Sequence, residues 1–394
     1  MQLDAIQAAL RDAQLDGWLF YDHHHRDPIA YRILGLSEAL HITRRWFYFI
    51  PAQGTPRKLV HRIESFRLDP LPGEAQAYSS WQELEAGLGQ LLHGASRIAM
   101  QYSPRNAIMY VSMVDAGTIE VLRELGKTIV SSADLVSRFE AVLTPQQEAS
   151  HQEAQQKIDA ILDAGFREIG RRVRSGSGVT EYSMVEWFQH AMRDAGLVWE
   201  HGPNVSVNAH SSDSHYEPTA EHTAPIRSGD FLLIDIWARR DRANTDGTGS
   251  CFYDITWTGV VDREPTREEQ TVFTTVRDAR DAAIQVVKEA FAARRPIAGW
   301  EADDAARAVI RNAGYGEYFT HRTGHNIAAE IHGSGAHLDN FETHDERLLL
   351  PHTCFSVEPG VYLPHFGIRS EVNMLTSERE ARVTGRIQTE LVRV

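Results

Sequence analysis

Two acidic residues interrupt apolar, strand-like segments in the second half of the chain. Asp235 lies within FLLIDIW and Asp254 within FYDITWT. A buried carboxylate without a partner is costly, so each needs a cation or hydrogen-bond donors. Asp235 could instead reach solvent or pair with an arginine such as Arg239. If the segment between them is a long hairpin loop, the strands pair antiparallel and the carboxylates share one sheet face, which favours a cation between them.

Three histidines follow within twelve residues, beside glycines. His321 and His325 lie in THRTGH, and His332 lies in IHGSG. A single histidine is usually structural, but imidazole is also a common metal ligand and proton shuttle. No HExxH segment is present, so the spacing alone does not define a zinc site.

Two glutamates complete this group of potentially reactive side chains. Glu358 precedes the Pro-Gly turn of SVEPGVY, and Glu371 lies in GIRSEVN, two residues after Arg369. Glu371 could form a salt bridge with Arg369 unless the arginine binds substrate. Four carboxylates with one histidine suit Mn²⁺, Fe²⁺, Co²⁺ or Zn²⁺ better than a thiolate site would. Two such ions, about 3.5–4 Å apart, can polarise a carbonyl group.

The elements that must position these residues show an internal repeat. Thr144 with Gln147 and Thr266 with Glu269 are two capping boxes, and each predicts the start of a long helix. In both copies a second helix ends at a glycine and strand-like segments follow. The order predicts an internally duplicated α+β domain over residues 144–394.

Residues 1–143 form a separate predicted α/β domain, in which short strand-like and helical segments alternate. The run His23-His24-His25 could bind a metal, but a solvated loop is the favoured interpretation, because nothing in the run sets a ligand geometry. The predicted strands are Asp16–Tyr21, Trp46–Ile50 and Arg97–Met100, and the predicted helices are Leu84–Leu92 and Thr118–Leu125.

The bulk composition excludes several classes of protein. The formal net charge is −14, so no basic footprint for nucleic acid is present. The two cysteines, Cys251 and Cys354, are too few for a disulfide framework and are expected to be reduced and partly buried. The amphipathic N-terminus is not a signal peptide, and no apolar run is long enough to span a membrane. A cytoplasmic location is expected.

At these residues the chain resembles the metallopeptidase family of methionine aminopeptidase, aminopeptidase P and prolidase, which has the "pita-bread" fold. The resemblance covers residues 144–394, and the first domain more weakly resembles the one that precedes it in creatinase and prolidase. It implies two divalent metal ions, with manganese expected and cobalt, zinc and iron as alternatives. The implied metal ligands are Asp235, Asp254, His325, Glu358 and Glu371.

The resemblance also implies roles around the metals. His215 and His332 would stabilise the transition state, Glu358 would shuttle a proton, and His321 and Arg369 would bind substrate. A homodimer and a small proline-containing peptide substrate are expected.

The sequence departs from the family pattern at four positions. Asp246 stands eleven residues after Asp235, the typical spacing, but its surroundings are loop-like, whereas Asp254 lies in a strand-like Asp-Ile-Thr segment. The other three are Trp257, where an arginine is common, Asn326 after the metal histidine, and Pro203 near a tyrosine position.

The expected function is hydrolysis of Xaa-Pro bonds, with dipeptides favoured over longer peptides by the chain length. An Xaa-Pro aminopeptidase and a methionine aminopeptidase are alternatives within the family. A creatinase-like hydrolase without metal and a non-catalytic binding module are the others, and both usually lose the ligand set. Metal content and metal-stimulated hydrolysis distinguish these possibilities.

Overall fold

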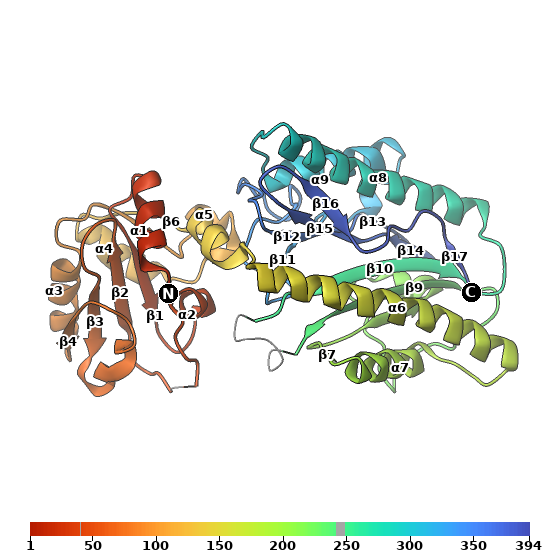
Figure 1. The fold of residues 1–394 in the computed structure, drawn as a ribbon, viewed down its shortest axis with the longest axis horizontal. Helices are drawn as coiled ribbons and strands as arrows, with labels where there is room; N and C mark the ends of the chain where they lie inside the picture. Colours follow the sequence, from red (N-terminus) through yellow and green to blue (C-terminus); the bar gives the residue numbers. More distant parts are fainter. Residues whose placement is uncertain (40, 242–248) are drawn as a thin grey trace. The chain divides into compact units, whose positions relative to one another are not determined.

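The protein, described here from a computed structural model over residues 1–39, 41–241 and 249–394, contains two compact units. They comprise Met1–Glu140 and Ala141–Val394 (Figure 1). Both combine helices with sheets. Among the described helices, none has the length and apolar composition that a membrane span requires.

The first unit is built on a six-stranded sheet in the order β4-β3-β2-β1-β5-β6. Only β2 runs antiparallel to its neighbours. The strands are β1 (Gly17–Asp22), β2 (Trp46–Pro51), β3 (Arg57–His61), β4 (Glu74–Tyr78), β5 (Arg97–Met100) and β6 (Thr128–Ser131). The helices are α1 (Leu3–Asp12), α2 (Pro28–Leu34), α3 (Trp81–Leu91), α4 (Ala116–Glu124) and α5 (Ala133–Val136).

Strand β1 shows why this sheet is buried on both faces. Its side chains alternate between two apolar clusters, as the period of a strand requires. Trp18 and Phe20 belong to the cluster that contains α1 and α2, whereas Leu19 and Tyr21 belong to the cluster that contains α3 and α4. A strand that is covered on both faces has a continuous apolar sequence. The apolar segment GWLFY therefore predicts a buried strand here.

The second unit has two helix pairs with sheets between them (Figure 1). Its helices are α6 (Pro145–Ser175), α7 (Glu181–Asp194), α8 (Arg267–Ala292) and α9 (Gly299–Asn312). Its strands are β7 (Leu197–Val198), β8 (Asn204–Val207), β9 (Phe231–Arg240), β10 (Tyr253–Val260), β11 (Asn326–Ile327), β12 (Cys354–Val357), β13 (Gly360–Leu363), β14 (Phe366–Arg369), β15 (Val372–Thr376), β16 (Ala381–Thr384) and β17 (Val392–Arg393).

The two halves of this unit repeat one plan, which confirms the predicted α+β class and duplication. Both predicted capping boxes are present, with Thr144 and Thr266 as the N-caps of α6 and α8. Helices α6 and α7 pack on β8–β10, while α8 and α9 pack on β12–β15. The shorter helix of each pair is followed by a left-handed glycine, Gly196 or Gly314, with φ of 70° and 86°.

Strands β9 and β10 pair antiparallel, as predicted, with Asp235 opposite Thr256 and Trp237 opposite Asp254. Residues two apart on a strand share a face. The pairing therefore places the side chains of Asp235, Trp237, Asp254 and Thr256 on one face of the sheet.

Candidate functional site

One cavity of about 600 Å³ in the second unit gathers every predicted site residue. The side chains come from strands β9, β10 and β14, from the segments that flank β11 and β12, from the segment between β8 and β9, and from the junction of β14 with β15. The predicted residues that line it are Asp235, Asp254, His215, His321, His325, His332, Glu358, Arg369 and Glu371. Residues far apart in the sequence thus meet in one concave site, as a binding or catalytic function requires.

The centre of the cavity is a compact cluster of potential ligands. Atoms of Asp254, His325 and Glu371 all lie within 4.8 Å of one another. The Nε2 atom of His325 lies 3.6 Å from Oδ2 of Asp254 and 3.2 Å from Oε1 of Glu358. Within the described chain, Oδ1 of Asp254 and Oε1 of Glu371 are buried without a hydrogen-bond partner. Such orphaned carboxylate oxygens are what a bound cation would satisfy.

The fourth carboxylate of the predicted ligand set, that of Asp235, accepts hydrogen bonds from protein donors. Its Oδ2 accepts a short hydrogen bond from Arg369, and its Oδ1 lies 2.9 Å from the Thr256 hydroxyl. The same hydroxyl lies 2.8 Å from Oε2 of Glu371. The arginine that pairs with Asp235 is therefore Arg369, whereas Arg239 donates to Ser250.

Crowding of acids in a buried site shifts their protonation. Burial and the charges of Asp235 and Glu358 raise the pKa of Asp254 to about 7, against the opposing hydrogen bond and charge of His325. Burial and the charges of Asp254 and Glu358 raise the pKa of Glu371 well above its ordinary value. Burial opposes the charge of Glu358 as well, but His325 and Arg369 bring its pKa below the usual range. Without added positive charge, this set of carboxylates is electrostatically unfavourable.

Two of the predicted histidines are neutral. The neighbouring His325 and then burial lower the pKa of His332 to about 3, and the two rings pack with centroids 4.3 Å apart. Burial lowers the pKa of His321 to about 4. Its Nε2 lies 2.7 Å from the Tyr362 hydroxyl, which also accepts from Arg369 at 3.2 Å.

Two supporting residues were not predicted. The Thr256 hydroxyl contacts both Asp235 and Glu371. The Ser356 hydroxyl donates to Glu358 at 3.0 Å and accepts from the backbone N–H of His325 at 2.9 Å. Thr256 stands two residues after Asp254 on β10, and Ser356 on β12 stands two residues before Glu358, so same-face spacing was the available signal.

Two of the departures from the family pattern, Trp257 and Asn326, have structural explanations. Trp257 stacks under the guanidinium of Arg386, 4.6 Å from the ring centroid. The Asn326 amide bonds the backbone of Cys354 and Gly335, so it braces the turns behind His325. Asp246, the alternative to Asp254, lies outside the described residues.

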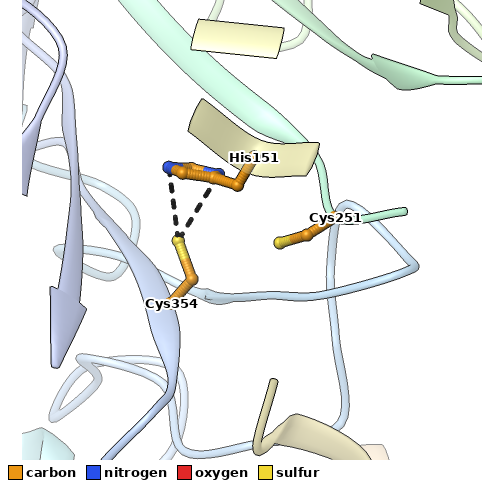
Figure 2. Close-up of side chains that lie close together, drawn as sticks. All are labelled: His151, Cys251 and Cys354. Carbon is orange, nitrogen blue, oxygen red and sulfur yellow. Dashed lines mark hydrogen bonds between the residues drawn. The ribbon is translucent and has the colours of Figure 1, made fainter. Parts of the chain in front are cut away.

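A second group of possible ligands, His151, Cys251 and Cys354, lies within 4.8 Å (Figure 2). Both cysteines are fully buried, so the expectation of partial burial is wrong. The Nδ1 atom of His151 bonds the Phe252 carbonyl at 2.5 Å, and Nε2 bonds the Thr384 hydroxyl at 2.8 Å. Because the Phe252 carbonyl can only accept, Nδ1 carries the proton, and the one free lone pair of the neutral ring, on Nε2, is engaged by the Thr384 hydroxyl. This group does not fit a metal site.

Comparison with known protein families gives a result that agrees with the candidate metal ligands in the cavity. The model of metallopeptidase family M24 matches residues 149–378, which is more than half of the chain. The chain therefore belongs to this family.

Three individual relatives share between 23% and 27% sequence identity with this chain. The Xaa-Pro dipeptidase of Lactobacillus helveticus is 27% identical over 242 residues, 61% of this chain and 58% of the relative. That of Pyrococcus furiosus is 26% identical over 262 residues, 66% of this chain and 67% of the relative. The chain thus spans less than two thirds of the Lactobacillus protein. The crystal structure of dipeptidase PepE from Mycobacterium ulcerans is similar in fold, with a TM-score of 0.71 at 23% identity over 100% of this chain and 97% of the other.

Membership in a metallopeptidase family implies divalent metals, and the cavity fits them. It offers carboxylate oxygens and an imidazole, the donor set that suits first-row divalent ions. Two of its buried oxygens have no other partner in the described chain.

Proposed function

We propose that this protein is a metal-dependent peptidase that hydrolyses Xaa-Pro bonds, with Xaa-Pro dipeptides as preferred substrates. The observation that carries the proposal is the convergence of Asp254, His325 and Glu371 within 4.8 Å, with orphaned oxygens on both acids. Asp235 and Glu358 would complete the ligand set for two ions. Two relatives named Xaa-Pro dipeptidase support the substrate class.

The side chains around the ligands have separable roles in this proposal. Bound divalent ions, with manganese expected, would polarise the scissile carbonyl and acidify water. Glu358, steadied by the Ser356 hydroxyl at 3.0 Å, would take the proton from the attacking water and pass it to the leaving amine. His332, neutral because its pKa is about 3, and His215 at the exposed side of the cavity would donate to the developing oxyanion.

Arg369 would order this site and contact the substrate. Its guanidinium bonds Asp235, Thr256 and Tyr362, so its position is determined by three elements. Through Tyr362 it also sets the orientation of His321, whose Nδ1 lies 2.7 Å from the Arg322 carbonyl. This chain would present His321 and Arg369 to the substrate in one geometry.

The decisive experiment is metal-dependent hydrolysis by purified protein. We expect chelated protein to be inactive on Xaa-Pro dipeptides and to recover with Mn²⁺, Co²⁺ or Zn²⁺. Xaa-Pro tripeptides and Met-Ala peptides serve as the comparison, because preferential cleavage of either would favour an aminopeptidase. Protein that binds metal but cleaves none of these peptides would refute the proposal.

The choice of ligand is tested separately. Asp254→Ala should abolish metal-stimulated activity, whereas Asp246→Ala should retain it. The reverse result would show that Asp246 is the ligand. A homodimer and a cytoplasmic location stay predictions, for sedimentation and cell fractionation to test.

A further inference from the structure

The first unit contains a cavity of its own, of about 520 Å³. It lies at one end of the strands of the six-stranded sheet. Tyr21, His61 and Tyr78 are at the carboxyl ends of β1, β3 and β4, and Arg45 directly precedes β2. Because β2 is antiparallel to β1 and β3, the first residue of β2 lies at the same end of the sheet as the last residues of β1 and β3. Open α/β sheets commonly bind ligands in the crevice outside the carboxyl ends of their parallel strands.

The lining of this cavity is cationic in a chain whose net charge is −14. Arg26, Arg44 and Arg45 line it together with His23 and His61. A balanced surface would place acids among them, so the concentration of positive groups is the feature that requires an explanation.

The carboxylates nearest this charge are engaged by other donors. Outside the lining, Glu64 accepts from the backbone N–H of Thr43 at 2.9 Å and of Arg44 at 3.1 Å. The single acid in the lining is Asp115, whose carboxylate accepts from the backbone N–H and hydroxyl of Thr118 at 2.9 and 3.0 Å. Within the described residues, none of the three lining arginines forms an ion pair. The pKa of His23 is lowered by burial and then by the positive charges of His24, Arg26 and Arg45, which is consistent with an unbalanced cluster.

An aromatic surface adjoins the charges. Trp81, the first residue of α3, lines the cavity and remains 62% exposed. Tyr21 and Tyr78 provide further ring surface at the strand ends. A large apolar side chain beside guanidinium groups suits a molecule with an anionic head and a flat or apolar body.

We propose that this cavity is a binding site for a small organic oxyanion, a carboxylate or a phosphate ester. The anionic group would contact Arg26 and Arg45, because the guanidinium fork matches both kinds of oxyanion. The body of the ligand would cover Trp81. The volume lies in the range of about 300–1,000 Å³ typical of small-molecule sites. The proposal is independent of the peptidase function, since no residue of the metal cavity takes part in it.

Titration of the full-length protein tests this site. Pyrophosphate represents the phosphate source and citrate the carboxylate source, with chloride at matched ionic strength as the control anion. We expect saturable heat by calorimetry and a change in tryptophan fluorescence with at least one of the two oxyanions. Binding of only one identifies the source, and binding of both indicates recognition of the shared oxyanion chemistry. Absence of saturable binding of both anions would overturn the proposal.

Variants locate the binding. The double variant Arg26→Ala and Arg45→Ala should bind at least about tenfold more weakly. Arg97→Ala is the matched control. Arg97 is an exposed arginine at the start of β5, which lies at the opposite end of the strands from the cavity. It should bind within about twofold of the wild type if the effect is local rather than a general loss of charge. Equal weakening by Arg97→Ala would refute the site.

Trp81→Phe provides an independent readout. It should remove the fluorescence change while the calorimetric heat persists, because phenylalanine keeps a ring at the lip of the cavity. A fluorescence change that survives this substitution would place the anion elsewhere and overturn the assignment. Unchanged melting temperatures would show that the exposed substitutions leave the unit folded.

Discussion

The hydroxyl of Thr256 offers the sharpest test of how the metal cavity is organised. It lies 2.9 Å from Asp235, 2.8 Å from Glu371 and 3.0 Å from Nε of Arg369, and the residue is fully buried. A hydroxyl has one proton to donate, so it links the acids in turn while accepting from the arginine. Thr256→Val removes this group and keeps the shape of the side chain.

The expected effect is on metal affinity. Removing a group that orients metal ligands typically weakens binding by about 10–100-fold. This corresponds to about 1.4–2.8 kcal/mol. A hydrogen bond to a charged group is worth about 1.5–3 kcal/mol, so loss of one such bond in the metal-bound state accounts for the effect.

Thr258→Val is the matched control for this substitution. Thr258 is also fully buried on β10, two residues away, but its Oγ1 atom has no hydrogen-bond partner within the described chain. Competition with a chromogenic chelator would measure the metal dissociation constant of both variants. Thr258→Val should stay within about threefold of the wild type. If Thr256→Val does too, or if both lose affinity equally, the shared hydroxyl does not organise the ligands.

Three further variants test chemistry and stability. Glu358→Gln should slow Xaa-Pro hydrolysis by about 10²–10⁴-fold in a steady-state assay while the protein stays folded, and a rate within about tenfold of the wild type would exclude proton transfer by this residue. Asp303→Ala should destabilise the fold by about 3–5 kcal/mol in denaturant titrations, because it leaves the buried Arg307 guanidinium without its carboxylate at 3.0 Å; a loss below about 1 kcal/mol would contradict this. Burial raises the pKa of Asp27 to about 7, so the stability it contributes when neutral is present at acid pH and lost as pH rises through about 7. Asn at position 27 stays neutral, and the stability advantage of Asp27→Asn over the wild type should therefore grow between pH 4 and pH 7, whereas a constant difference in melting temperature would refute the shifted titration.

The candidate ligand residues can be found in the sequence because each lies in a short segment whose local pattern determines its position. Asp235 and Asp254 interrupt apolar strands, and the period of two then assigns each to one face. Glu358 precedes a Pro-Gly turn, which locates it at the end of β12. Local rules of this kind are also why both capping threonines were found.

Features that depend on register between distant segments were not predictable. Whether the Thr256 hydroxyl reaches Asp235 depends on which residues pair across a hairpin of unknown length. The strand order of the first unit places β1 beside β5, which no local signal specifies. The same holds for the cationic cavity. The run that contains His23 is a loop, as the sequence predicts, but only the tertiary structure places His23 beside Arg44 and Arg45.

The two cysteines have a practical consequence. Cys251 and Cys354 are the only thiols of the chain and are fully buried side by side in the second unit. A thiol reagent can reach them only when the start of β12 or the segment before β10 leaves its place. The rate of modification in native buffer therefore reports how often this unit opens, without any engineered label. Ions that bind the neighbouring carboxylates should slow that rate. The rate of modification of the two native thiols would therefore report metal binding without any substitution in the protein.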